Sequence, residues 1–242
     1  MVFEEIAFHE TSLGALSLRK RTDLRAGGQL VHEVILGDDF LMSSLFTAGE
    51  CALADLTLAQ LAKPQLDIVV GGLGLGYTAA TALRNSRTAE LIVIDILGPV
   101  IEWHRKHQVP LGAELAEDDR CRLLCEDFFK LAANRALGFD PEQPGRRFDA
   151  VLLDIDHSTE HWLPPGNREL YSVAGLRSLA AQLRKDGAFG LWSNDPPVDA
   201  FTDMLRAVFV EVDAQVVSFP NPYTEDSSTC TVYVARTPRQ AT

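Results

Sequence analysis

Short apolar runs alternate with segments of helical periodicity, and this alternation constrains the fold more than any other feature of the sequence. The apolar runs are Ile68–Val70, Leu91–Ile94, Cys121–Cys125, Asp149–Leu153 and Ala188–Trp192. The helical segments are Thr47–Lys63, the residues from the glycines to Asn85, Val100–His107, Phe128–Leu137, Leu170–Arg184 and Asp199–Val208. Strands that alternate with helices form a parallel sheet covered on both faces. The sequence therefore predicts an α/β fold, a Rossmann-like, doubly wound and mostly parallel sheet, over residues 46–242.

Both ends of the chain depart from this alternation. Val210–Phe219 and Ser228–Ala235 are β-rich with no helix between them, so the sheet is predicted to end in an antiparallel hairpin. Residues 1–45 hold three β-like runs, Phe3–Phe8, Leu16–Arg19 and Gln29–Leu36, separated by turn signals. Three short strands are too few for a core of their own. We expect a small N-terminal β unit that packs on the larger domain.

The net charge of the chain and its first residues limit the classes of partner and the cellular compartment that we expect. The chain carries 34 acidic and 22 basic residues, a net charge of −12, which disfavours nucleic-acid backbones and anionic membranes as partners. The segment Met1–Ile6 is acidic where a signal peptide needs basic residues, and no apolar run approaches the roughly 18 residues of a membrane helix. Four cysteines lack zinc-ligand spacing. We expect a cytoplasmic protein with reduced thiols and no metal.

A glycine-rich turn follows the first expected strand, at the sheet edge where open α/β domains bind ligands. The turn Gly71–Tyr77 allows a ligand to approach the backbone beside a helix N-terminus. Tyr77 stands where a nicotinamide fingerprint has its third glycine, and no Gly-Lys-Ser/Thr ending of a triphosphate loop is present. Tyr77 either contacts a ligand or packs under the turn. The candidate ligand-binding residues of this turn are Gly71, Gly72, Gly74, Gly76 and Tyr77.

Two acids end the next two strands in register with the glycine turn. Asp95 follows Gly76 by 19 residues, the separation at which a carboxylate reaches ribose hydroxyls. Asp127 ends the third strand, where it could meet an adenine edge, although Asp before Phe128 is also a good helix N-cap. Together with the turn, these acids indicate a nucleoside pocket that needs no pyrophosphate.

The segment after the fourth strand holds further candidates. Asp154, Asp156, His157 and His161 lie within eight positions, but their spacing is not that of a zinc protease helix. The alternatives are solvated loop histidines or a role in acceptor binding and proton removal. Trp192 ends the fifth strand and either walls the pocket or belongs to the core. His104 is interpreted as part of a solvated helix face.

This arrangement resembles the class I S-adenosylmethionine-dependent methyltransferases and, within them, the spermidine synthase-like (polyamine aminopropyltransferase-like) branch. The resemblance rests on four segments, Ile68–Gly76, Val93–Arg105, Asp149–Asp154 and Leu170–Gly175. It implies that the glycine turn wraps the donor, S-adenosylmethionine or its decarboxylated form. It also implies that Asp95 holds the ribose, that Asp127 holds the adenine amino group, and that Asp154 stands beside the reacting carbon.

Three departures from the family pattern bear on the substrate. Gly74 takes the position of an acid that, in the family, pairs with the amine of the decarboxylated donor. The Tyr-His-Glu acceptor element of the family falls on Ala48–Glu50 and keeps only its acid, Glu50. The Asp-Ser-x-Asp-Pro loop appears as Asp154–Ser158, so its second acid has shifted to Asp156 or become His157. Two of these changes remove diamine-binding groups and favour intact S-adenosylmethionine.

We therefore predict a methyltransferase-like transferase that binds S-adenosylmethionine and acts on a small acceptor. Because the cleft contains several acids, a cationic acceptor is favoured. Asp154 would align the acceptor, Asp156 or His157 would take its proton, and Glu50 and Trp192 would contact it. The alternatives are a polyamine aminopropyltransferase that uses the decarboxylated donor and a catalytically idle adenosyl-binding scaffold. The family resemblance and the exposed N-terminal strands also favour a homodimer.

Overall fold

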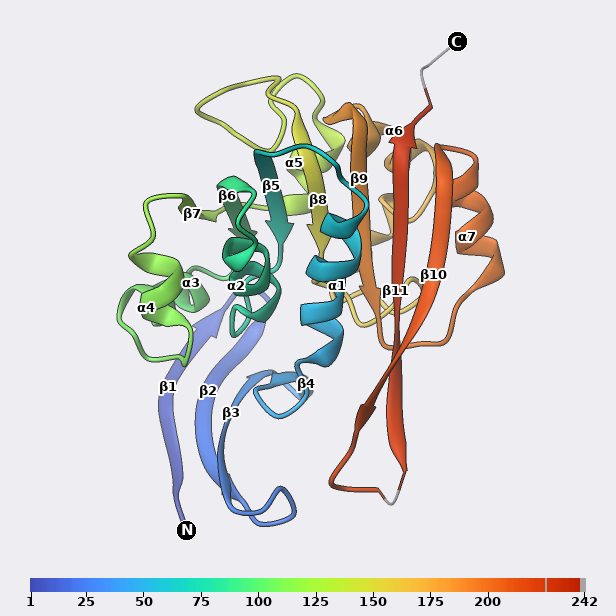
Figure 1. Ribbon diagram of the computed structural model, residues 1–242. Helices are drawn as coiled ribbons and strands as arrows, with labels where there is room; N and C mark the ends of the chain where they lie inside the picture. The colour runs from blue at the N-terminus through green and yellow to red at the C-terminus, as the bar shows by residue number, and fades with distance from the viewer. Residues whose placement is uncertain (225, 240–242) are drawn as a thin grey trace.

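Two β-sheets organise the chain (Figure 1), and the computed structural model describes residues 1–224 and 226–239. The larger sheet has the order β10-β11-β9-β8-β5-β6-β7. Its strands are β5 (Leu66–Gly71), β6 (Thr88–Asp95), β7 (Cys121–Cys125), β8 (Phe148–Leu153), β9 (Leu183–Ser193), β10 (Phe209–Pro220) and β11 (Ser227–Pro238). The strands from β9 to β7 run parallel, and β11 and β10 complete the sheet antiparallel. The predicted mostly parallel α/β sheet with a terminal antiparallel hairpin is confirmed.

Helices cover both faces of this sheet and divide the core in two. The first face carries α1 (Ala48–Ala59), α2 (Tyr77–Arg84), α3 (Gly98–Arg105) and α4 (Gly112–Ala116). The second carries α5 (Phe128–Ala133), α6 (Val173–Ala180) and α7 (Asp199–Arg206). Alternate strand residues face opposite ways. Ile68 and Val70 of β5 therefore belong to the first core, whereas Val69 belongs to the second.

Three predicted helices are clearly shorter than their sequence patterns indicate, and the one expected over Thr47–Lys63 ends at Ala59. The helix expected over Leu170–Arg184 begins only after Ser172, whose hydroxyl accepts the Gly175 amide as an N-cap. Its C-terminal part belongs instead to a turn and to β9, which starts at Leu183. A 3₁₀ helix, η1 (Pro165–Glu169), precedes α6. The helix expected over Phe128–Leu137 ends at Ala133.

The N-terminal sheet has one strand more than predicted. It contains β1 (Phe3–Thr11), β2 (Gly14–Asp23), β3 (Gln29–Leu36) and β4 (Asp39–Ser43), paired antiparallel in chain order. Leu16, Leu18 and Val34 are buried in the first core of the larger domain. This sheet therefore packs on the larger domain, as expected for strands without a core of their own. It lies beyond the carboxyl ends of the parallel strands (Figure 1).

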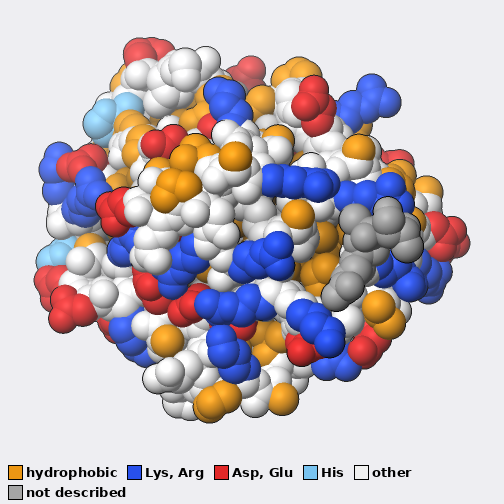
Figure 2. Space-filling model, turned by 90° about the horizontal axis from the view of Figure 1, so that it is seen from above, with side chains coloured by type: hydrophobic (Ala, Val, Ile, Leu, Met, Phe, Trp, Pro, Cys, Tyr) orange, Lys and Arg blue, Asp and Glu red, His pale blue; other side chains and the backbone are white. Residues whose placement is uncertain are grey.

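The opposite end of the parallel sheet is held by ion pairs. Lys and Arg side chains gather on the face seen from above, over the amino ends of the strands (Figure 2). Arg146 pairs with Glu90 at 2.7 Å and with Asp140 at 3.1 Å, while Arg184 pairs with Asp67 at 2.6 Å. These pairs join the amino ends of β5 and β6 to the loop before β8 and to the start of β9, so they stabilise this end of the sheet. No helix among the described residues is long and apolar enough to cross a membrane.

Candidate active site

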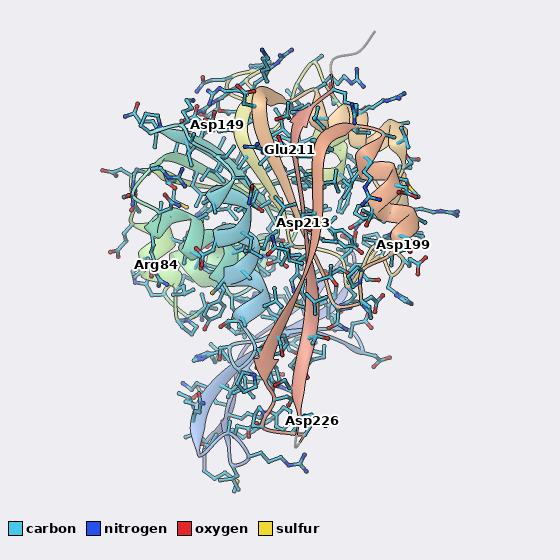
Figure 3. All side chains as sticks on the ribbon, turned by 45° about the vertical axis from the view of Figure 1, so that its right-hand side comes forward. Arg84, Asp149, Asp199, Glu211, Asp213 and Asp226 are labelled. Carbon is cyan, nitrogen blue, oxygen red and sulfur yellow. The ribbon has the colours of Figure 1, made fainter. Side chains whose placement is uncertain are left out.

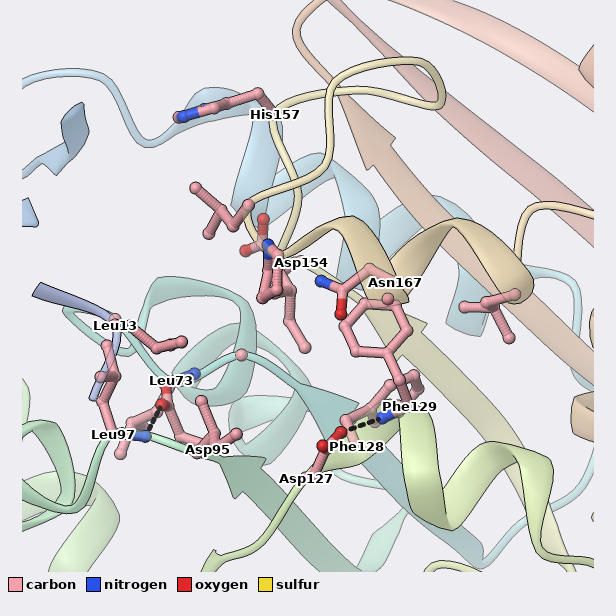
Figure 4. Close-up of a pocket in the computed structure, with 18 of the residues that line it drawn as sticks. Leu13, Leu73, Asp95, Leu97, Asp127, Phe128, Phe129, Asp154, His157 and Asn167 are labelled. Atoms are coloured by element: carbon pink, nitrogen blue, oxygen red, sulfur yellow. Dashed lines mark hydrogen bonds between the residues drawn. The ribbon is translucent and has the colours of Figure 1, made fainter. Parts of the chain in front are cut away.

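A cavity of about 870 Å³ lies at the carboxyl ends of the parallel strands, where the sequence places its candidate residues. From the predicted donor-binding set, Gly72, Gly74, Tyr77, Asp95 and Asp127 line it. From the predicted catalytic and acceptor-binding set, Glu50, Asp154, His157 and Trp192 line it. The structure thus brings nine of the twelve candidates to one cavity, and Gly71, Gly76 and Asp156 lie outside its lining. Figure 4 shows Asp95, Asp127 and Asp154 around the same hollow.

The glycine turn between β5 and α2 needs glycine for steric reasons. Gly72, Gly74 and Gly76 have φ of +95°, +46° and +92°, conformations that other residues rarely adopt. A Cβ on Gly72 would collide with the Asp154 carbonyl oxygen, and one on Gly71 would lie 2.6 Å from the Phe128 ring. Gly71 and Gly76 therefore serve the close packing of the turn, and neither belongs to the cavity lining.

His104 fixes this turn, a role that the sequence interpretation missed. The expectation of a solvated helix face was wrong for this residue, because His104 is 0% exposed. Its Nε2 lies 3.0 Å from the Gly74 carbonyl oxygen, and burial lowers its pKa to about 4. At neutral pH the ring is therefore uncharged and donates Nε2–H to that carbonyl. Val100 and Ile101, at i−4 and i−3 on the same helix face, are the sequence signal that could have revealed this burial.

Asp95 and Asp127 are both held by backbone amides at the cavity rim (Figure 4). Asp95 Oδ2 accepts the Leu73 amide at 2.9 Å and Oδ1 accepts the Leu97 amide at 2.8 Å. Each Asp95 oxygen keeps a lone pair for a hydroxyl donor. Asp127 caps α5, with Oδ1 accepting the Phe129 amide at 3.0 Å. The N-cap interpretation of Asp127 is therefore confirmed, while its side chain also lines the cavity.

Glu50 and Asp154 are neighbouring carboxyl groups that both line the cavity. Burial and the charge of Asp154 raise the pKa of Glu50, and burial likewise raises the pKa of Asp154. Thr78 is buried on α2, and its hydroxyl donates to Asp154 Oδ2 at 2.6 Å, which favours the ionised carboxylate. The pair therefore holds protons that isolated carboxylates would release, and it is suited to receive a positive charge.

Asp156 is turned away from the cavity, and the structure does not support its predicted role in proton removal. Its Oδ1 accepts from the Leu163 amide and from Asn167 Nδ2, both at 2.8 Å, and its Oδ2 accepts the Tyr171 hydroxyl at 2.8 Å. Asp156 is 3% exposed and organises the loop between β8 and α6. His157 lies on the same loop and belongs to the cavity lining at its edge. No group of three metal-ligating side chains converges within the described part of the chain.

Trp192 and Met42 form two walls of the cavity, and the sequence motifs do not predict that these two side chains lie at the same site. A Cβ on Gly49 would collide with the Trp192 indole, so the glycine in the acceptor element makes room for this ring. Met42 comes from β4, and its sulfur accepts the Leu75 amide at 3.0 Å. A Cβ on Gly74 would collide with the same sulfur. The thioether of Met42 therefore occupies the space into which a side chain at position 74 would extend.

Carboxyl groups outnumber basic side chains in the lining. Among the described residues it contains five carboxylates, Glu50, Asp95, Asp127, Asp154 and Glu169, against one lysine, Lys130, and one histidine, His157. Lys130 is already paired with Asp127 at 3.2 Å. Clefts of one sign concentrate ligands of the opposite sign. The charge of the cavity favours cationic ligands.

Comparisons with known proteins agree with this geometry, although no family model matches the chain. A polyamine aminopropyltransferase of Pyrobaculum islandicum is 29% identical over 121 residues, which is 50% of this chain and 38% of that protein. Polyamine aminopropyltransferase 2 of Pseudomonas aeruginosa is 25% identical over 165 residues, 66% of this chain and 44% of that protein. The matched segments thus span less than half the length of these curated relatives.

Solved structures match over nearly the whole chain. The spermidine synthase from Thermotoga maritima superposes with a TM-score of 0.70 at 16% identity, covering 96% of this chain and 72% of that one. A spermidine synthase in complex with the transition state analogue AdoDATO superposes with a TM-score of 0.72 at 18% identity, covering 96% and 73%. The chain has the spermidine synthase fold and distant homologues among the polyamine aminopropyltransferases, which confirms the predicted resemblance.

Proposed function

We propose that this chain transfers an aminopropyl group from decarboxylated S-adenosylmethionine to a primary amine of a small polyamine. The observation that carries the proposal is the Glu50–Asp154 carboxylate pair in a cavity lined by five carboxylates and one lysine. Donor and acceptor are both polycations, and neither brings a carboxylate that this lining would repel. The names of the relatives point the same way, so the aminopropyl alternative replaces the methyl-transfer preference drawn from the sequence.

The donor would lie along the strand ends, with its nucleoside toward Asp95 and Asp127. The free lone pairs of Asp95 accept the ribose hydroxyls, and the glycine turn lets the sulfonium approach the backbone. Held in this way, the aminopropyl methylene attached to sulfur faces Asp154. Positioning of this kind supplies most of the rate enhancement in a displacement whose leaving group is already activated.

The transfer is a single displacement at that methylene carbon. The Asp154 carboxylate first takes a proton from one primary ammonium of the acceptor, which frees the lone pair of that nitrogen. The nitrogen then forms a bond to carbon while the carbon–sulfur bond breaks, sulfur keeps the electron pair as neutral methylthioadenosine, and the product nitrogen remains as a secondary ammonium. Burial raises the pKa of Asp154, which brings it closer to the operating pH and makes it a better proton acceptor. Glu50 stabilises the positive charge of the acceptor.

Methyl transfer from intact S-adenosylmethionine is the second candidate, and one observation favours it. Met42 fills the space beside Gly74, so this end of the cavity carries a thioether where the family resemblance implies an amine-binding acid. In that reaction the acceptor attacks the methyl carbon, and sulfur leaves as S-adenosylhomocysteine. The catalytically idle scaffold remains the third possibility to be tested.

The test mixes the protein with putrescine and each donor and quantifies products by mass spectrometry. Release of methylthioadenosine from the decarboxylated donor, lost in Asp154→Asn, would support aminopropyl transfer. Formation of S-adenosylhomocysteine alone would favour the second candidate. Calorimetry with methylthioadenosine completes the test, because binding without turnover of either donor identifies a scaffold. Absence of binding at millimolar nucleoside would overturn all three hypotheses.

A further inference from the structure

One buried amide in the cavity has no role in the reaction described above. Asn167 lies on η1 and is 6% exposed, yet it lines the cavity beside Phe128 and Phe129 (Figure 4). Its Nδ2 donates to Asp156 at 2.8 Å, whereas its Oδ1 has no hydrogen-bond partner among the residues that the structure describes. This oxygen is not fully enclosed, so a ligand in the cavity can reach it and replace water as its hydrogen-bond partner. Asn167 therefore presents an available acceptor to whatever fills this part of the cavity.

The neighbours of Asn167 fix which end of its amide faces the cavity. Asp156 Oδ1 already accepts the Leu163 amide, and Asp156 Oδ2 accepts the Tyr171 hydroxyl, so the carboxylate acts as an acceptor throughout. Only the nitrogen of Asn167 can pair with such a group. The oxygen and one remaining N–H of the amide are then available to a ligand. An acceptor beside a donor is the pattern that pairs with the amino group and adjacent ring nitrogen of adenine.

The acid predicted to recognise adenine is less free than Asn167. Asp127 Oδ1 accepts the amides of Phe129 and Lys130 at 3.0 and 3.1 Å, and its Oδ2 pairs with Lys130 Nζ at 3.2 Å. Its contacts are those of a helix cap. Asn167, in contrast, is oriented by its hydrogen bond to Asp156, and its Oδ1 and one N–H remain available to a ligand.

We propose that Asn167 recognises the amino edge of the adenine ring, and that Asp156 and Tyr171 are positioning residues that orient its amide. The inference rests on the proposed binding of an adenosyl donor in this cavity. It assigns Asp156 a place in nucleobase selectivity rather than in proton transfer. A hypoxanthine ring, which carries an oxygen in place of the amino group, would set that oxygen against Asn167 Oδ1. We expect selectivity for adenine over hypoxanthine of about tenfold or more.

Calorimetry of methylthioadenosine and methylthioinosine against wild type and Asn167→Leu tests the proposal. The wild type should prefer the adenine nucleoside by about tenfold, and Asn167→Leu should lose the preference by weakening adenine binding alone. Tyr171 lies outside the cavity lining and donates a hydrogen bond to Asp156. Tyr171→Phe removes that bond and should partially reduce the preference for the adenine nucleoside. Ser178→Ala is the matched control and should keep the preference, because this lining side chain makes no hydrogen bond to the part of the chain that the structure describes.

The outcomes separate this inference from the proposed function. If the wild type binds neither nucleoside, the proposed donor binding fails. If it binds and discriminates but Asn167→Leu discriminates equally, the role of Asn167 is wrong. Asn167→Ser provides a smaller, polar replacement in case the leucine variant does not fold. A merely structural Asn167 would weaken both nucleosides alike, and that result would also overturn the proposal.

Discussion

Individual side chains in the cavity lining are held in states that they would not adopt in water. Glu50 and Asp154 are carboxylates whose pKa values are both raised, by burial first and, for Glu50, also by the neighbouring charge. Thr78 opposes this effect at Asp154 through a 2.6 Å hydrogen bond. Burial and the Thr78 hydrogen bond have opposite effects on the pKa of Asp154, and together they set the pH range in which the pair can accept a proton. Substitutions can remove these effects one at a time.

Replacing Thr78 by valine should move the acid limb of the pH–rate profile to higher pH. The hydroxyl favours ionised Asp154, so its loss raises the pKa of Asp154 further, and a base works only above its pKa. A hydrogen bond to a charged group contributes about 1.5 to 3 kcal/mol, which corresponds to a displacement of roughly one pH unit or more. The profile of kcat/KM gives the measurement. Thr78→Ser keeps the hydroxyl and should retain the wild-type limb; an unmoved limb in Thr78→Val would exclude this role.

Glu50→Gln should stabilise the unliganded protein, and more so at alkaline than at acid pH. The folded-state pKa of Glu50 lies above its unfolded value, so the wild type loses stability as pH rises through that folded pKa. Glutamine has no such dependence. Each kcal/mol recovered raises Tm by about 2 to 4 °C for a chain of this size. Thermal unfolding at pH 5 and pH 9 gives the comparison, and an equal difference between the two proteins at both values would contradict the burial argument.

At the scale of elements, the connection between β5 and α2 controls the shape of the donor site. Three left-handed glycines turn the chain, and His104 of α3 fixes the Gly74 carbonyl from behind. The sulfur of Met42, on β4, accepts the Leu75 amide of the same turn. The turn is therefore positioned by a helix of the larger domain and by a strand of the N-terminal sheet.

Gly72→Ala should destabilise the protein far more than Gly27→Ala does. Both glycines have positive φ, +95° and +71°, so both substitutions incur about 1 to 2 kcal/mol of backbone strain. Only at Gly72 does the new Cβ also collide with a backbone atom, the Asp154 carbonyl oxygen, whereas nothing lies within 4 Å at Gly27. Urea denaturation measures the difference, and nucleoside binding should be lost in Gly72→Ala alone. Equal destabilisation of the two variants would mean that the turn can yield.

At the scale of the whole molecule, the cavity depends on how the N-terminal sheet is attached. The hairpin of β10 and β11 extends beyond the larger sheet toward the N-terminal sheet, with Asp226 near its tip (Figure 3). Tyr223 on this hairpin donates its hydroxyl to buried Asp23 and lies 3.0 Å from Arg21. Phe46 packs against Phe219 and Tyr223. The C-terminal hairpin thus holds the sheet that brings Met42 to the cavity.

Tyr223→Phe should loosen the N-terminal sheet without unfolding the rest. The hydroxyl donates to Asp23 and accepts from Arg21, so the substitution removes two hydrogen bonds of about 0.5 to 1.5 kcal/mol each and would speed amide exchange in β2 and β3 by roughly fivefold to a hundredfold. Hydrogen exchange followed by mass spectrometry can resolve this sheet from β5 and β8. Tyr233→Phe makes the same chemical change inside the larger domain and should leave the N-terminal sheet unaffected. Uniform exchange changes in Tyr223→Phe would show that the contact is not a local attachment.

The sequence by itself determined the parallel sheet, its antiparallel ending and the glycine turn with acids at the following strand ends. These features depend on local periodicity and on backbone sterics, which each segment carries alone. The fourth N-terminal strand escaped prediction because β4 is only five residues long and follows β3 after a two-residue turn.

Only the tertiary structure decided which candidate side chains face the cavity. Asp154 and Asp156 are two residues apart, yet one lies in the cavity and the other is enclosed by Leu163, Asn167 and Tyr171. His104 is buried because the glycine turn packs on its helix face, and Met42 reaches Gly74 from 32 positions earlier in the chain. Side-chain direction and burial depend on contacts between distant segments, and spacing along a single chain cannot encode them.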